Sequence, residues 1–426
     1  MSETWQSGIR FADISDVGMR RANNQDSFAS LPADSEERFT ARGHLFVVAD
    51  GMGAHAAGEL ASRMAIERIA MQYFRSAQGD ATEALRDAVR DANAEIHRRG
   101  RQNPEFHNMG TTASSLAILP EGAVIAHVGD SRVYRLRNGT LEQLTFDHSL
   151  VWEMQASGQV HPDSVLGQSI PKNVITRSLG PNAEVAVDVE GPFEIRPGDA
   201  FLLCSDGLTG QVDDAEIGAL VDCLPEDQAT RVLVDLANLR GGPDNTTVII
   251  VRVQGHRPAA RPRRSDGQPP AVSPLLLAAV AACVLGAIVL AVANQPKTMV
   301  IAIMLAIVAA ATAAFQYQTN RKPRRIGDAG PRRGGRAPYR RYDAAATAEL
   351  TERLRGTVDA LREAAQNKHW DIDWAGIDDL QRKAAQSLED QAPKEAVRFQ
   401  SEAIIETMKQ LREQHNRMAG ETAIDH

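Results

Sequence analysis

Residues 133–144 read VYRLRNGTLEQL, two short β-like runs joined by Asn138-Gly139. An Asn-Gly pair between such runs is a strong β-hairpin signal, because both residues tolerate the positive φ angles of a tight turn. Further short apolar runs rich in branched residues predict strands at 45–50, 123–130, 200–206 and 246–253. The hairpin therefore predicts that at least part of the sheet structure is antiparallel.

Two segments between the first two of these runs are typical of helices, residues 58–75 and 81–99. In the first, Ile66, Ile69 and Tyr73 recur at steps of three and four, which places them on one helix face. Strands and helices do not alternate regularly along the chain, so a parallel doubly wound sheet is not favoured. The pattern favours an α+β fold in which antiparallel sheets are covered by helices.

The charge of the 426-residue chain is divided sharply by region. Residues 1–250 carry a net charge of −15, residues 251–341 carry +13, and residues 342–426 carry −6. An acidic globular region cannot neutralise phosphates, which argues against nucleic acid as a partner. The three cysteines have no CxxC spacing, so neither a disulfide framework nor a zinc site is expected.

Two apolar runs, 275–293 and 299–315, lie inside the basic region. Each is close to the roughly 20 residues that cross a bilayer, so they predict a transmembrane helical hairpin at 274–318. The alternative is a pair of buried core helices. Basic residues flank the hairpin at both ends, in a Pro/Arg-rich linker (255–273) and a basic juxtamembrane linker (319–341). By the positive-inside rule, the sequence predicts a multi-pass inner-membrane protein in contact with lipid, with both terminal regions in the cytoplasm.

The segment 342–426 shows three apolar stripes at helical spacing, which begin at Leu350, Ile377 and Val397. Three amphipathic helices could close a small bundle or pair with a helical partner, and the sequence leaves both open.

Five aspartates lie at or near the ends of the predicted strands, most of them beside glycine: Asp26, Asp50, Asp130, Asp206 and Asp244. Each alone is typical of an ordinary turn. Several carboxylates that converge in one cleft cannot all stay ionised without a counter-charge. Oxygen ligands of this kind suit Mg²⁺ or Mn²⁺.

The motifs around these aspartates occur in a set order. They are RANNQD (21–26), DGMGAH (50–55), MGTT (109–112), GDSR (129–132), DHS (147–149), TRSLG (176–180), SDGL (205–208) and GPDN (242–245). This ordered set resembles the bacterial type 2C, or PPM, protein phosphatases over about residues 8–253, which places a phosphatase domain at 1–254. The resemblance implies a sandwich of two antiparallel sheets flanked by helices.

The same resemblance implies two Mn²⁺ or Mg²⁺ ions and a third metal site. Asp50 would bridge the two ions, with the Gly51 carbonyl as a further ligand. Asp206 and Asp244 would hold the first ion, Asp26 would support the second, and Asp130 with Asp206 matches the third site. Arg21 would grip the phosphate oxygens, because its planar fork suits phosphate. Arg21, Asp50 and Asp206 are thus the expected catalytic residues.

The sequence departs from relatives of this kind at the general acid. Met52 stands where animal members carry a histidine proposed for this role. His55 is the nearby candidate, and packing at a helix start is its alternative. Residues 146–178 correspond to the flap of bacterial relatives, where substrate choice is expected to reside.

The resulting hypothesis is a phosphoserine/phosphothreonine protein phosphatase, a hydrolase tethered to the cytoplasmic face of the membrane. Its water nucleophile attacks phosphorus directly, and a eukaryotic-like Ser/Thr kinase would be its functional counterpart. Two alternatives remain: a phosphoprotein-binding pseudophosphatase, which predicts a lost metal ligand, and a membrane assembly scaffold built on the C-terminal helices.

Overall fold

The structure is a computed structural model. It describes residues 8–53, 56–75, 80–161, 164, 167, 169–171, 174–255 and 336–424, with side chains of the last helix given through Gln414. The predicted transmembrane hairpin (274–318) and most of the two predicted linkers that flank it lie outside these ranges.

The described strands form two sheets in which every neighbouring pair is antiparallel. The first sheet has the order β1–β11–β10–β7–β8–β12, with bounds Ile9–Asp16, Thr246–Val253, Ala200–Cys204, Arg132–Arg137, Thr140–Gln143 and Arg340–Asp343. The second has the order β2–β3–β5–β6–β9, with β4 paired to β3. Its bounds are Asp26–Leu31, His44–Met52, Ala113–Leu119, Gly122–Val128 and Asp188–Phe193, with β4 at Gly110–Thr111.

The β-hairpin predicted at residues 133–144 is formed by β7 and β8. Asn138 and Gly139 adopt φ angles of 51° and 72°, and Arg137 pairs with Thr140 across the turn. Both angles lie in the left-handed region that an Asn-Gly turn requires. The hairpin prediction is therefore confirmed.

The two sheets pack face to face. Phe46 and Val48 of β3 meet Phe201 and Leu203 of β10 in the core between the sheets, and all four are fully buried. Alternate residues of β3 point the other way and contact helices. A strand buried on both faces is expected where a sheet has a second sheet on one side and helices on the other.

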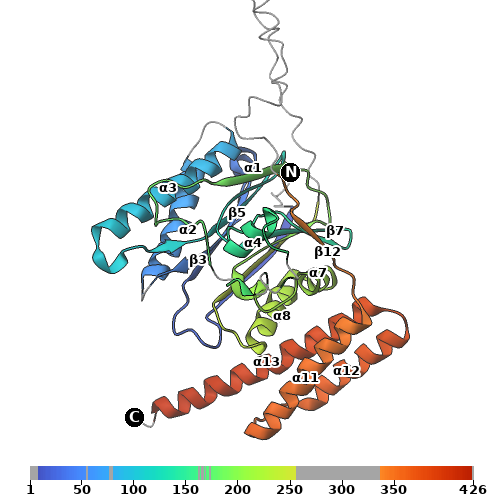
Figure 1. Ribbon diagram of the computed structural model, residues 1–426. Helices are drawn as coiled ribbons and strands as arrows, with labels where there is room; N and C mark the ends of the chain where they lie inside the picture. Colours follow the sequence, from blue (N-terminus) through green and yellow to red (C-terminus); the bar gives the residue numbers. More distant parts are fainter. Residues whose placement is uncertain are drawn as a thin grey trace, which may run out of the picture. The chain divides into compact units, whose positions relative to one another are not determined.

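Helices cover the outer face of each sheet (Figure 1). Helices α2 (Ala57–Arg75) and α3 (Ala81–Gln102) pack on the second sheet, and α7 (Asp214–Cys223) and α8 (Glu226–Leu239) pack on the first. The shorter helices are α1 (Glu36–Arg42), the 3-10 turn η1 (Pro104–Phe106), α4 (Leu150–Ala156) and α6 (Asp206–Thr209). The predicted α-β-β-α sandwich is confirmed.

The C-terminal segment is helical, as predicted, and consists of α11 (Ala348–Lys368), α12 (Trp374–Glu389) and α13 (Pro393–Ile424). Leu354 of α11 and Ile404 of α13 are fully buried in the same core cluster as Leu233 of α8. Residues 333–426 form one compact unit with residues 1–258. The apolar stripes of these helices thus have a partner within the chain.

The prediction of an inner-membrane protein with two crossings is wrong on the evidence of the described residues. None of their helices combines the length and the apolar character that a bilayer crossing needs. The long helices are amphipathic instead. Helix α11, for example, places Arg353 and Arg355 beside buried Leu354.

Candidate active site

The five aspartates singled out above come together at one edge of the sandwich. Asp26 begins β2 and lies directly opposite Asp50 of β3 in the strand register. Asp130 follows β6, Asp206 follows β10 and begins α6, and Asp244 lies just before β11. The ends of strands from both sheets therefore deliver carboxylates to a shared place.

The charges of these side chains act on one another. The pKa of Asp50 is raised well above its ordinary value, first by its enclosure in the protein and then by the charges of Asp26, Asp206, Asp130 and Asp244. Like charges in a poorly solvated site disfavour ionisation of each member. The cluster thus carries more negative charge than it can hold without a cation.

Asp26 is held rigidly in this cluster. The hydroxyls of Ser205 and Thr247 each donate a hydrogen bond to Oδ2 of Asp26 at 2.7 Å. These bonds favour the carboxylate, but burial outweighs them and raises the pKa of Asp26 to about 7. Its second oxygen, Oδ1, has no hydrogen-bond partner among the described residues.

Asp130 and Asp206 share this property. Burial, followed by the charges of Asp206 and Asp147, raises the pKa of Asp130 to about 8. Burial and then the charge of Asp244 raise the pKa of Asp206. In both residues Oδ1 is buried, and no donor from the described part of the chain reaches it. A buried acceptor without a partner is costly, so three such oxygens in one cluster fit a hard divalent cation.

The cluster is not yet a closed metal cage. Among the described residues, no three His, Cys, Asp or Glu side chains have the spacing of a finished ion site. Ions such as Mg²⁺ keep several waters and take only one or two carboxylates from the protein. The donor set present here therefore suits an open, partly hydrated site.

Gly51 lies where backbone segments of the site approach each other closely. A Cβ atom there would stand 2.1 Å from the Gly58 carbonyl oxygen and 2.6 Å from that of Gln25. The Gly51 amide donates to the Gln25 carbonyl at 3.1 Å, which ties the loop before β2 to the end of β3. Glycine is needed here because the backbones approach too closely for any side chain.

Arg21 lies at the rim of the cluster, half-exposed. Its Nη2 contacts Asp244 Oδ2 at 2.7 Å, and its Nε donates to the Pro243 carbonyl at 3.3 Å. Asn245 fixes the same loop, because its amide donates to the carbonyls of Val17 and Asn23. The structure thus brings Arg21 to the aspartates.

His55, the candidate general acid, lies outside the described residues. Cys204 is fully buried in β10, and burial raises the pKa of its thiol. A buried neutral thiol is not a nucleophile.

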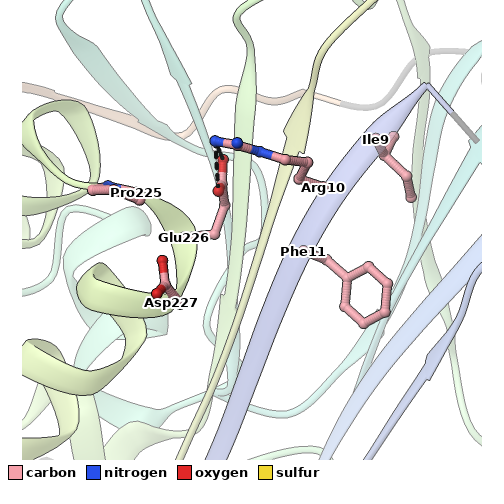
Figure 2. Close-up of a pocket in the computed structure, with 6 residues that line it drawn as sticks. All are labelled: Ile9, Arg10, Phe11, Pro225, Glu226 and Asp227. Atoms are coloured by element: carbon pink, nitrogen blue, oxygen red, sulfur yellow. Dashed lines mark hydrogen bonds and ion pairs between the residues drawn. The ribbon is translucent and has the colours of Figure 1, made fainter.

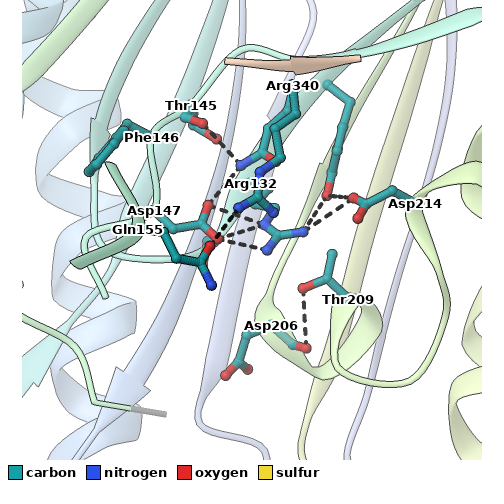
Figure 3. A network of polar contacts seen from close by, with 12 residues as sticks. Arg132, Thr145, Phe146, Asp147, Gln155, Asp206, Thr209, Asp214 and Arg340 are labelled. Atoms are coloured by element: carbon teal, nitrogen blue, oxygen red, sulfur yellow. Dashed lines mark hydrogen bonds and ion pairs between the residues drawn. The ribbon is translucent and has the colours of Figure 1, made fainter. Parts of the chain in front are cut away.

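A polar network beside the cluster was not assigned a role from the sequence (Figure 3). Arg132 pairs with Asp147 at 2.7 Å and with Asp214 at 3.2 Å, and it holds the Tyr134 hydroxyl at 2.9 Å. The GDSR and DHS motifs contain Arg132 and Asp147, so the signal was present. The sequence could not show that these residues form ion pairs, because pairing between distant segments leaves no local pattern.

This network forms one side of a cavity of about 680 Å³. Its lining includes Asp130 and Asp206 of the cluster, Trp152 and Gln155 of α4, and Arg340 of β12. A second hollow, of about 370 Å³, lies between Arg10 of β1 and Glu226 of α8, which form an ion pair at 3.1 Å (Figure 2). None of the predicted site residues lines that second hollow.

A family model described as "Protein phosphatase 2C" matches residues 19–235. The chain belongs to the protein phosphatase 2C family. As a member, it is a serine/threonine protein phosphatase, a hydrolase. The match covers each segment that contributes an aspartate except the last, because Asp244 lies beyond its end.

Named relatives agree with this assignment. The protein phosphatase PhpP of Streptococcus pneumoniae is 37% identical over 243 residues, which are 56% of this chain and 95% of that protein. The serine/threonine protein phosphatase PstP of Mycobacterium tuberculosis is 36% identical over 247 residues, 58% of this chain and 45% of that one.

Solved structures show the same fold. The crystal structure of the M. tuberculosis phosphatase matches with a TM-score of 0.51 and 36% identity, covering 58% of this chain and 99% of that chain. The phosphatase Stp1 of Staphylococcus aureus matches with a TM-score of 0.52 and 29% identity, covering 58% and 96%.

Proposed function

We propose that the aspartate cluster holds two divalent cations, Mn²⁺ or Mg²⁺, and that the protein uses them to hydrolyse phosphoserine and phosphothreonine without a covalent intermediate. Phosphatases of this family use these ions. The observation that carries the proposal is the meeting of five carboxylates, three of which have a buried oxygen without a donor. When bound, the cations supply charge for the phosphoryl oxygens and a water activated for attack on phosphorus.

The position of each residue suggests its part. Asp50 feels the charge of the four other aspartates, which suits a carboxylate shared between the two ions, with the Gly51 carbonyl beside it. Asp206 and Asp244 influence each other and would hold the first ion. Asp26, fixed by two hydroxyls, would support the second through water.

Asp130 is proposed for a third ion site together with Asp206. Asp130 and Asp206 both line the cavity beside the cluster. Its pKa is raised chiefly by burial and then by the charge of Asp206, so the two carboxylates are near neighbours. A cation between them would relieve the repulsion.

Arg21 is proposed to bind the phosphoryl oxygens. Its guanidinium already lies against Asp244, so the charge is present at the rim of the cluster. A planar guanidinium can donate to two phosphate oxygens at once, which a lysine cannot do. The side chain is exposed enough to meet a substrate that arrives from solvent.

A phosphoprotein-binding pseudophosphatase is the alternative. It requires a lost metal ligand, whereas Asp26, Asp50, Asp206 and Asp244 all reach the same cluster. Phosphoproteins are the partners in either case. The kinase counterpart expected from the sequence stays a prediction.

Phosphate release from a phosphothreonine peptide in the presence of Mn²⁺ separates these two functions. We expect turnover by the full chain, and a loss of about a thousandfold in Asp50→Asn, because removal of a shared ligand weakens both ion sites by several kcal/mol. Asp34→Asn is the matched control, since Asp34 is an exposed acid paired only with Arg38. No turnover by the unaltered chain would instead support the pseudophosphatase.

A further inference from the structure

Strand β12 brings the C-terminal part of the chain onto the phosphatase fold. Arg340 lies opposite Gln143 of β8 in the strand register, and the amide of Tyr339 donates to the Gln143 carbonyl at 2.9 Å. The Tyr339 hydroxyl donates at 2.5 Å to Glu190 of β9, which belongs to the other sheet. The returning strand is therefore attached to both sheets.

Arg340 reaches from this strand to helix α4. Its guanidinium lies over the indole ring of Trp152 with its central carbon 3.7 Å from the ring centroid, and its Nη2 donates to Gln155 Oε1 at 3.1 Å. Through these two contacts Arg340 packs against one face of α4. A guanidinium stacked on an aromatic ring at this distance is a favourable cation–π arrangement.

Aromatic packing also attaches the returning segment to α4. The Phe146 ring meets the Trp152 ring edge to face at 5.4 Å and the Tyr339 ring at 5.5 Å. Tyr339 precedes Arg340, so two consecutive residues of the returning segment contact this cluster. Helix α4 is thus held by residues from the far end of the sequence.

The position of α4 matters because the helix forms a wall of the cavity beside the aspartates. Val151, Trp152 and Gln155 of α4 line the cavity together with Asp130, Asp206 and Arg340. Gln155, Asp206 and Arg340 are labelled in Figure 3. At about 680 Å³ the cavity exceeds what a phosphoryl group alone would fill, and it has room for neighbouring residues of a peptide.

Arg340 has no ion pair among the residues that the structure describes. Arg132 is the residue that pairs with Asp147 and Asp214. The Arg340 side chain contacts Trp152 and Gln155 of α4 and interacts with Tyr342 of its own strand, and its charge also acts to lower the pKa of Asp147. Its direct contacts are therefore chiefly with α4.

We propose that Arg340 is a positioning residue for phosphoprotein substrates: by holding Trp152 and Gln155 it fixes helix α4 as the wall against which the peptide around the phosphorylated residue binds. This inference rests on the proposed phosphatase function and adds to it a determinant of substrate binding. A small aryl phosphate needs the aspartate cluster but not this wall, so the two kinds of substrate should respond differently.

The test compares a phosphothreonine peptide with para-nitrophenyl phosphate, using the full chain and Mn²⁺. For Arg340→Ala we expect kcat/KM on the peptide to fall about tenfold through a higher KM, since a cation–π contact and a hydrogen bond are lost. Activity on para-nitrophenyl phosphate should stay within about twofold. Arg340→Lys should resemble the alanine variant, because an ammonium cannot stack as a plane.

Arg341→Ala is the matched control. Arg341 is the next residue of the same strand, but its side chain is 65% exposed and, among the described residues, pairs with Glu142 of β8 at 3.1 Å rather than with α4. It should leave both activities unchanged. The inference is overturned if Arg340→Ala and Arg341→Ala behave alike, or if Arg340→Ala lowers both activities equally.

A double-variant comparison keeps the test decisive if Arg340→Ala also lowers stability. Trp152→Leu removes the other half of the contact, so Arg340→Ala should have no additional effect on the peptide KM in that background. Additive losses would contradict the inference. If the unaltered chain hydrolyses neither substrate, the proposed phosphatase function fails instead, which is a distinguishable result.

Discussion

The hydroxyl of Ser205, which follows a strand of the first sheet, donates a hydrogen bond at 2.7 Å to Oδ2 of Asp26, which begins a strand of the second sheet. Thr247, also from the first sheet, donates to the same oxygen at 2.7 Å. The site therefore joins both layers of the sandwich. This relationship connects the fold to the proposed chemistry and leads to measurements on stability as well as activity.

Asp130→Asn should stabilise the chelator-treated protein at pH 8. The unfolding free energy should rise by a few kcal/mol, which is on the order of what the pKa shift of Asp130 implies. The folded-state pKa of Asp130 is about 8, whereas an unfolded aspartate loses its proton near pH 4. The unaltered protein should thus lose stability as pH rises from about 4 to 8, and the variant should lose less, because only Asp26, Asp50 and Asp206 of the buried cluster then contribute. Urea unfolding at both pH values measures it.

At pH 4 both forms of the chelated protein should be nearly equal in stability, since the carboxyl is protonated when folded. If Asp130→Asn is no more stable than the unaltered protein at pH 8, then the carboxylate is not under the repulsion described here.

His127 should contribute an acid-induced loss of stability. Its ring is buried between Ser114 Oγ at 2.9 Å and the Phe146 carbonyl at 3.0 Å, and burial lowers its pKa to about 3. Below about pH 6.5 the unfolded chain takes a proton that the folded chain refuses until about pH 3, so stability falls across that interval. In His127→Gln the unfolding free energy should depend less steeply on pH between 6.5 and 4.5. Equal slopes would show that His127 is charged when folded.

Gly51→Ala should abolish phosphate release and lower stability, because its Cβ would overlap the Gly58 carbonyl. Gly356 of α11 provides the contrast, since a Cβ there has nothing within 4 Å. Gly356→Ala should raise stability by up to about 1 kcal/mol through better helix propensity. Thermal unfolding and activity assays measure both. An active Gly51→Ala enzyme would mean that the backbone around the site can separate.

Arg412→Met should destabilise the protein by about 2 kcal/mol. Arg412 of α13 contacts the fully buried Asp235 of α8 at 2.5 Å, and removal of the cation leaves a buried carboxylate without its partner. The estimate is reduced from the value for a fully buried pair because Arg412 is 39% exposed. Lys409→Met is the control, since its contact with Glu406 is 3.8 Å long and exposed. Equal stability of the two variants would mean that α13 is not anchored at Asp235.

The parts of this molecule that the sequence predicts are those with a local signal. The β7–β8 turn has Asn138-Gly139, the tail helices have periodic stripes, and Asp50 lies at the end of an apolar strand beside Gly51. Each of these follows from backbone preference or from the burial of one face, which are legible over a few residues. The residues of the aspartate cluster could be named from the sequence because their motifs occur in a recognisable order.

The parts that escaped prediction depend on contacts between distant segments. Strand β12 contains only Arg340–Asp343, and its arginines were interpreted as part of a basic linker. Nothing local distinguishes an arginine that stacks on Trp152 from one that faces solvent. In the same way, the stripe that contains Ile404 shows that α13 needs an apolar partner, but not that the partner is α8.

The most direct test of the account is the number of Mn²⁺ ions bound per chain at equilibrium, measured by dialysis and elemental analysis. We predict two tightly held ions for the unaltered protein and for Asp34→Asn, and fewer than one for Asp50→Asn. Retention of two ions after Asp50→Asn would contradict the claim that the gathered carboxylates exist to hold paired cations.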